Sequence, residues 1–158
     1  MSKKTRIISA FPACGKTHLF DNGYEDSVII DSDSSKFSWL PDGVTRNPDF
    51  PGSYIKHIKE NVGKVDYILV SSHIDVRNAL DASGLCWAFV APRHSLMLEW
   101  VGRCWIRGSS EGFINTMIAN WDSWTDVHNG PMPNGVSILS SNQYLSDSMR
   151  FLETLTYN

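Results

Sequence analysis

Residues 6–17 read RIISAFPACGKT, and this stretch decides the fold. Its first part, residues 6–10, is a short apolar run of the kind that forms a buried β-strand. Its last part is Gly15-Lys16-Thr17, and an apolar segment that favours a helix follows at once. A strand, a glycine-containing turn and a helix in this order have the register of the Walker A motif, GxxxxGK[ST]. The stretch therefore predicts a phosphate-binding loop at residues 10–17, which we call the GKT loop.

The residue types of the GKT loop suit the phosphates of ATP. Gly15 lets the backbone approach a phosphate, and successive N–H groups at a helix N-terminus bind anions. Lys16 would bring a positive charge to the β and γ phosphates, and the Thr17 hydroxyl would reach Mg²⁺. We therefore predict that ATP and Mg²⁺ bind here. The predicted nucleotide contacts are Ala13, Cys14, Gly15, Lys16, Thr17 and His18.

One position departs from the Walker A pattern, because Ala10 stands where the motif has its first glycine. Ala10 falls at the end of the predicted strand, where alanine fits if its φ is negative. The alternative interpretation is an ordinary strand–turn–helix corner that contains Gly-Lys-Thr by chance.

Beyond this loop, short apolar runs alternate with amphipathic segments, which is the pattern of a parallel α/β sheet. Apolar side chains at helical spacing predict helices over residues 97–104, 113–121 and 145–152. The stretch from residue 36 to 52 is rich in proline and predicts a loop-rich insertion. The strand runs are continuously apolar, as in strands covered on both faces. The predicted strands are residues 6–10, 27–31, 65–71, 86–91 and 136–139.

Composition narrows the class of protein. The chain has 158 residues, of which 42% are hydrophobic and 20% charged, and this predicts one globular domain over residues 1–158. A net charge of −3 lacks the basic excess of proteins that grip duplex DNA. The three cysteines have no metal-like spacing and predict reduced thiols. No run approaches the roughly 18 apolar residues that span a bilayer, so we expect a soluble cytoplasmic protein without a membrane partner.

Two carboxylates follow the second predicted strand, in the sequence Asp31-Ser32-Asp33-Ser34-Ser35. The carboxyl ends of parallel strands face the ligand crevice, so both carboxylates should lie near the GKT loop. An aspartate there can accept a proton from an acceptor hydroxyl or hold Mg²⁺. We predict Asp33 as a catalytic and metal-binding residue, with Asp31 beside it on the acceptor side. The alternative is a serine-rich turn that caps the next segment.

Two arginines follow the third and fourth predicted strands. Arg77 and Arg93 are placed to reach a phosphate on the acceptor. Arg77 is equally compatible with a surface helix, where it would pair with Asp75 or Asp81. The sequence therefore predicts Arg77 and Arg93 as acceptor-binding residues, with the surface-helix role as the alternative for Arg77.

Two further arginines, Arg103 and Arg107, share the face of a predicted helix that breaks at residues 108–112. A helix–loop–helix with two arginines can close over a transferring phosphoryl group and exclude water, which makes both residues catalytic candidates. The alternative is a solvated ion-pair ladder, since Glu99 lies four residues before Arg103.

With these residues identified, the chain resembles the small nucleotide kinases of the adenylate-kinase-like P-loop group, in particular phage-encoded ones. The resemblance covers the GKT loop, the 31–35 turn, the segment NPDFPGSYI at 47–55 and the pair Arg103-x-x-x-Arg107. It implies a three-layer α/β/α P-loop fold with a five-stranded parallel sheet and, if the chain is phage-encoded, the host cytoplasm. It also implies an acceptor-binding insertion at about 34–62, a lid at about 103–115, and contact between adenine and residues 140–143.

The resemblance implies an ATP- and Mg²⁺-dependent phosphotransferase acting on a nucleotide, first of all a (deoxy)nucleoside monophosphate. Two alternatives stay open. A kinase that phosphorylates a hydroxyl of a nucleic acid, at a 5′ end or on a hydroxymethylated base, has the same core and would use Asp33 as a base. A catalytically silent nucleotide-binding module would suit Ala10 and the lack of an aspartate at the end of the third strand. The base, the sugar and the oligomeric state stay open at this point.

Overall fold

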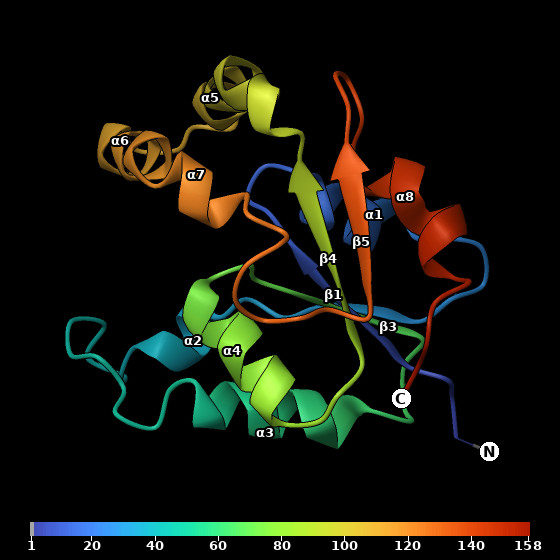
Figure 1. Cartoon of the computed structure of the whole chain (residues 1–158). Helices are drawn as coiled ribbons and strands as arrows, with labels where there is room; N and C mark the ends of the chain where they lie inside the picture. Colours follow the sequence, from blue (N-terminus) through green and yellow to red (C-terminus); the bar gives the residue numbers. More distant parts are fainter. Residues whose placement is uncertain (1) are drawn as a thin grey trace.

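The computed structural model describes residues 2–158 and contains one sheet of five strands, all parallel. The strands lie in the order β2-β3-β1-β4-β5 (Figure 1). The predicted five-stranded parallel sheet is confirmed, and the ends of the strands differ from the prediction by at most two residues. The strands are β1 (Arg6–Ala10), β2 (Ile29–Asp31), β3 (Tyr67–Val70), β4 (Trp87–Pro92) and β5 (Gly135–Leu139).

The helices follow the alternating pattern, with two differences from the prediction. The stripe over residues 113–121 is split, because one helix ends at Ala119 and the next begins at Trp121. A ten-residue helix also begins at Gly52, directly after the proline-rich insertion. The helices are α1 (Lys16–Asn22), α2 (Ser35–Ser38), α3 (Gly52–Asn61), α4 (Ile74–Ala82), α5 (Met97–Ile106), α6 (Glu111–Ala119), α7 (Trp121–Trp124) and α8 (Leu145–Leu152).

Side chains of the central strands alternate between the two faces of the sheet, and each face carries its own apolar core. On one face Ile8 and Val90 join residues of α1, α5, α6 and α8, among them the fully buried Trp100. On the other face Ile7 and Phe89 join residues of α3 and α4. The two cores make the three-layer α/β/α arrangement that the resemblance implied.

The expected burial on both faces holds for the three central strands only. Every residue of β3 and β4 is buried, and so are four of the five residues of β1. The edge strands β2 and β5 are mostly half-buried. An apolar run therefore marks a strand here even where helices cover it incompletely.

The order of the strands creates a crevice at their carboxyl ends. The chain leaves β1 toward the β2 side, returns through β3, and then passes over β1 to β4 and β5 on the other side (Figure 1). Loops that leave neighbouring parallel strands in opposite directions open a crevice where ligands bind in folds of this type. No helix within residues 2–158 has the length and apolar character needed to cross a membrane.

Candidate functional site

The GKT loop joins the end of β1 to the start of α1, and its backbone is left-handed at Ala13 and Gly15. Gly15, which caps the helix, has a φ of 97°, a value that favours glycine. Ala13 has a φ of 60°, which is unusual for a residue with a side chain. A Cβ at Gly15 would lie 3.3 Å from the Tyr144 ring, so both strain and space argue against a larger residue there. The local sequence thus builds the tight turn that the Walker A register predicts.

Ala10 causes no strain at the start of this loop. It is the last residue of β1, is buried, and pairs with Val90 of β4. Between residues 2 and 158 the only residues other than glycine with positive φ are Ala13, Glu25 and Asn142, so Ala10 has a backbone that alanine readily adopts. Ala10 therefore has the negative φ that allows alanine to replace the first glycine of the Walker A motif.

A cavity of about 550 Å³ lies beside the GKT loop and is lined by five separate segments of the chain. These are the loop itself, the turn after β2, the residues after β3, the region from α5 to the start of α6, and Tyr144. Nine of the predicted site residues line it, namely Ala13, Cys14, Gly15, Lys16, Thr17, His18, Asp33, Arg103 and Arg107. The structure thus brings together the loop, one carboxylate and both arginines of the predicted lid.

The side chains of the GKT loop are placed differently from one another. The Lys16 Nζ donates a hydrogen bond of 3.4 Å to the Ala10 carbonyl, so its charge lies across the loop. The Cys14 side chain is buried in the core, and burial raises the pKa of its thiol to about 11. The Cys14 carbonyl accepts a hydrogen bond of 2.7 Å from the Leu145 amide. Cys14 therefore ties the loop to α8 and offers no reactive thiol.

Asp31 and Asp33 stand at the end of β2 in different surroundings. Asp33 lines the cavity, and its Oδ1 accepts a hydrogen bond of 2.9 Å from the Ser35 amide, which is the turn-capping contact that the alternative interpretation predicted. Burial raises the pKa of Asp31, and the charge of Asp33 adds to this, while the charge of Lys16 and the Thr17 hydroxyl oppose it. Asp31 thus faces the Lys16–Thr17 end of the loop.

Three of the predicted acceptor residues, Asp31, Arg77 and Arg93, do not line this cavity, and the two arginines have partners elsewhere. Arg77 is only 3% exposed, and its Nε donates a hydrogen bond of 2.9 Å to the Ser72 carbonyl. Its guanidinium lies 4.5 Å from the centre of the Phe89 ring, so Arg77 is neither in the cavity nor paired on a surface helix. Arg93 donates to the Ser140 hydroxyl and lines a second cavity. The sequence could not reveal this, because both positions follow strands whose carboxyl ends do face the crevice.

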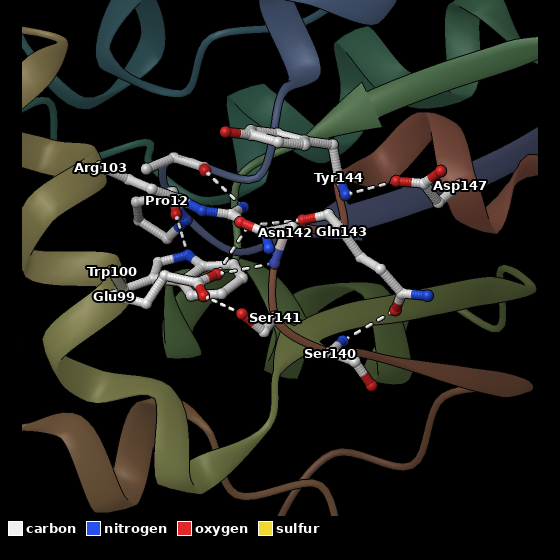
Figure 2. A network of polar contacts seen from close by, with 11 residues as sticks. Pro12, Glu99, Trp100, Arg103, Ser140, Ser141, Asn142, Gln143, Tyr144 and Asp147 are labelled. Atoms are coloured by element: carbon white, nitrogen blue, oxygen red, sulfur yellow. Dashed lines mark hydrogen bonds and ion pairs between the residues drawn. The ribbon is translucent and has the colours of Figure 1, made fainter.

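Arg103 lies between two aromatic rings and has polar contacts with two other segments (Figure 2). Its guanidinium carbon lies 3.8 Å from the centre of the Trp100 ring and 4.0 Å from that of Tyr144. It forms an ion pair of 2.9 Å with Glu99 and donates a hydrogen bond of 2.7 Å to the Gln143 carbonyl. The Arg103 side chain is 9% exposed and that of Glu99 is 26% exposed, so this ion pair is half-buried and is not the solvated ladder of the alternative interpretation.

The contacts around Arg103 join α5 to two loops, and we call this group of contacts the Arg103 clamp. Glu99 accepts hydrogen bonds from the Ser141 hydroxyl at 2.6 Å and from the Asn142 amide at 3.2 Å. The Trp100 Nε1 donates to the Pro12 carbonyl at 3.0 Å (Figure 2). The clamp therefore holds residues 140–144 in a set position relative to the GKT loop, and these include the segment 140–143 that the resemblance placed against adenine.

Arg107 is held more loosely than Arg103. It follows the last residue of α5, and its Nε donates a hydrogen bond of 2.8 Å to the Ser109 hydroxyl. The predicted helix break is confirmed but lies at residues 107–110, since α5 ends at Ile106 and α6 already begins at Glu111. Arg107 is thus the cavity-lining arginine whose guanidinium keeps most of its donors available for a ligand.

Sequence reasoning assigned no role to two residues that line the cavity, His73 and Tyr144. Burial lowers the pKa of His73, and the charge of Lys16 lowers it further, which favours a neutral imidazole. Both residues were detectable in principle. His73 follows β3 directly, and Tyr144 directly follows the segment expected to contact adenine. Comparison with known proteins adds nothing here, since no protein-family model matches the chain and no curated protein does either.

Proposed function

We propose that this protein is an ATP- and Mg²⁺-dependent phosphotransferase that acts on a nucleotide or a closely related acceptor. The observation that carries the proposal is the geometry of Gly15, Lys16 and Thr17 at the β1–α1 junction, across from two carboxylates at the end of β2. Backbone N–H groups and Lys16 suit the phosphates of the donor. The cavity of about 550 Å³ is of the size that small-molecule sites have.

Mg²⁺ fits the residues beside the loop. Burial is the largest cause of the raised pKa of Asp31, and the charge of Lys16, although it outweighs the repulsion from Asp33, does not cancel the effect of burial. A divalent cation held by the Thr17 hydroxyl and Asp31 would stabilise the ionised carboxylate. When bound, it would neutralise charge on the β and γ phosphates. Asp33, which lines the cavity, is then available for the acceptor.

For the acceptor, a hydroxyl is favoured over a phosphate monoester. A phosphate acceptor calls for arginines on its side of the cavity, and neither candidate is available there. Arg77 is buried against Phe89, and Arg93 lines another cavity. A hydroxyl acceptor instead calls for a base, and Asp33 is a carboxylate on that side of the cavity. The nucleoside monophosphate that the resemblance implied is therefore the second candidate.

In the proposed reaction the acceptor hydroxyl oxygen forms a bond to the γ phosphorus of ATP. The bond between the γ phosphorus and the β–γ bridging oxygen breaks, and ADP leaves with the electron pair. The hydroxyl proton passes to an Asp33 oxygen. Lys16 and Arg107 stabilise the negative charge on the transferring group, and the aromatic and apolar wall of the cavity limits access of water.

The test is an acceptor screen with γ-labelled ATP and Mg²⁺, using nucleosides, nucleoside monophosphates, single-stranded ends and hydroxymethylated DNA. The screen should show label transfer to a hydroxyl acceptor, with a loss of roughly 10²-fold or more for Lys16→Ala. The exposed Lys59→Ala variant on α3 serves as control and should keep full activity. Nucleotide binding without transfer to any acceptor would instead support the silent nucleotide-binding module.

Asp33→Asn separates the two acceptor classes. Asparagine keeps an oxygen for the Ser35 amide, so the turn should survive. Turnover of a hydroxyl acceptor should fall by roughly 10²–10⁴-fold while ATP affinity stays the same. Phosphorylation of a monophosphate, with Asp33→Asn affecting only the affinity for that acceptor, would overturn the hydroxyl assignment.

A further inference from the structure

The insertion between α2 and α3 contains a short, ordered hairpin, which we call the Trp39 hairpin (residues 38–47). Trp39 and Arg46 pair as an antiparallel bridge. The turn between them is held by Asp42, which accepts hydrogen bonds of 2.9 Å from the amides of Val44 and Thr45. The Thr45 hydroxyl donates to the same carboxylate at 2.6 Å. The hairpin is thus a formed element rather than a loose connection.

The exposed side of this hairpin presents an aromatic ring and a cation together. The Arg46 guanidinium lies 5.1 Å from the centre of the Trp39 ring and 5.8 Å from that of Phe50. Trp39 nevertheless remains 41% exposed. Exposure of so large an apolar ring is costly, and an arginine stacked on it keeps the ring in one orientation. The pair is therefore a preformed flat surface.

Packing links this surface to the acceptor side of the cavity. The pKa of His73, which lines the cavity together with Asp33, is lowered mainly by burial and by the charge of Lys16, and the charge of Arg46 lowers it further. Phe50 stacks on Tyr54, with ring centres 6.1 Å apart. The Tyr54 hydroxyl donates to the carbonyl of Ser32, the residue between the two carboxylates. Packing through Phe50 and Tyr54 therefore connects the Trp39 hairpin to the turn that carries Asp33.

From these contacts we propose that Trp39 and Arg46 form a stacking site for a nucleobase of the acceptor. The binding of a nucleobase is argued from these contacts alone, and only its assignment to the acceptor rests on the proposed function. Every nucleobase has a flat π face that stacks on an aromatic ring or a guanidinium. A surface that binds a nucleic acid only through its phosphates needs several cations. The hairpin carries Arg46 together with the carboxylate of Asp42, so it has no such excess of positive charge. The base can belong to a free nucleoside or to a single strand, and the two sources share this chemistry.

The test measures binding directly, so that it does not depend on catalysis. The probes are a fluorescently labelled single-stranded oligonucleotide of ten nucleotides and mixed sequence and, as competitors, free nucleosides. Trp39→Leu removes the flat ring and should weaken binding by roughly 5- to 150-fold, which corresponds to the loss of one stacked base. Trp39→Phe keeps a ring and should stay much closer to the wild type. Trp105→Ala, at a tryptophan that is 56% exposed on α5, is the matched control and should bind normally.

Each outcome decides the proposal. If Trp39→Leu lowers the affinity for the single strand but not for nucleosides, the acceptor is a nucleic acid. If it lowers the affinity for both probes, the site binds the nucleoside unit itself. Equal binding by Trp39→Leu and the wild type, or no binding of either probe by the wild type, overturns the stacking site. Arg46→Ala, with circular dichroism of each variant, guards against misfolding. Failure of the phosphotransferase proposal would appear separately, as lack of label transfer despite normal binding of the strand.

Discussion

At the scale of single residues, Asp31 couples the site to pH. Burial raises the pKa of its carboxyl above the ordinary value of 3.8. An acid with a raised pKa binds more protons in the folded chain, so its contribution to stability is largest at low pH. That contribution is lost as the pH rises through the folded pKa. Ionised Asp31 therefore destabilises the protein without ligand at neutral pH.

Asp31→Asn should accordingly raise the Tm at pH 7 and leave it nearly unchanged near pH 3, since both states are then largely protonated. Thermal unfolding without nucleotide or Mg²⁺ measures this. Asp81→Asn, on the exposed side of α4, is the control and should shift the Tm at neither pH. A lower Tm for Asp31→Asn at pH 7 would mean that the contacts with Lys16 and Thr17 outweigh the cost of burial.

Arg77 shows how a residue can be structural although its position in the sequence suggests catalysis. Arg77→Ala would leave the Ser72 carbonyl without its donor and remove the packing on Phe89. The free energy of unfolding should fall by about 2 kcal/mol or more, while turnover per folded molecule stays the same. Denaturant titration and kinetics together measure this, with the exposed Arg150→Ala on α8 as control. A fall in kcat with stability intact would return Arg77 to the acceptor site.

At the scale of elements, Arg103 on α5 and Arg107 at its C-cap have separate tasks. Arg103 belongs to the clamp that joins α5 to residues 140–144 and to the GKT loop, whereas Arg107 lines the cavity with few contacts of its own. Arg103→Lys keeps the charge but loses the planar group between Trp100 and Tyr144. It should therefore weaken the binding of ATP more than it lowers kcat.

Arg107→Ala should show the opposite pattern. Removing a charge that acts on the transferring group lowers kcat and kcat/KM together, here by roughly 10- to 1000-fold. Steady-state kinetics and equilibrium binding of ATP for both variants measure the contrast. If Arg103→Lys lowers kcat as strongly as Arg107→Ala at unchanged ATP affinity, Arg103 acts on the phosphoryl group and is not a positioning residue.

At the scale of the whole molecule, the residues that line the cavity follow strands at both edges of the sheet, from β2 to β5. A ligand bound there should therefore stabilise the entire fold. MgATP at about 100 times its Kd should add about 2.7 kcal/mol. For a chain of this size that raises the Tm by roughly 5–10 °C. AMP, which lacks the β and γ phosphates, should give a much smaller shift, and Lys16→Ala should lose most of the response to MgATP. An equal shift for AMP and ATP would contradict binding of the phosphates by the GKT loop.

The sequence by itself determined the features that depend on neighbouring residues. The GKT loop, the strands and the break after α5 were all predictable, because a strand or a tight turn is set by a few consecutive side chains and by glycine at positive φ. The two carboxylates were also found, because they follow β2 directly.

Only the tertiary structure decided what each arginine does. Arg77 and Arg93 follow strands that point toward the cavity, yet packing turned the first onto Phe89 and the second toward Ser140. Arg103 became a clamp residue because Tyr144, some forty positions away in the chain, closes over its free face. A long, flexible cation takes whichever ring, carbonyl or carboxylate the folded chain brings near it, and those partners are set by contacts that no local pattern contains.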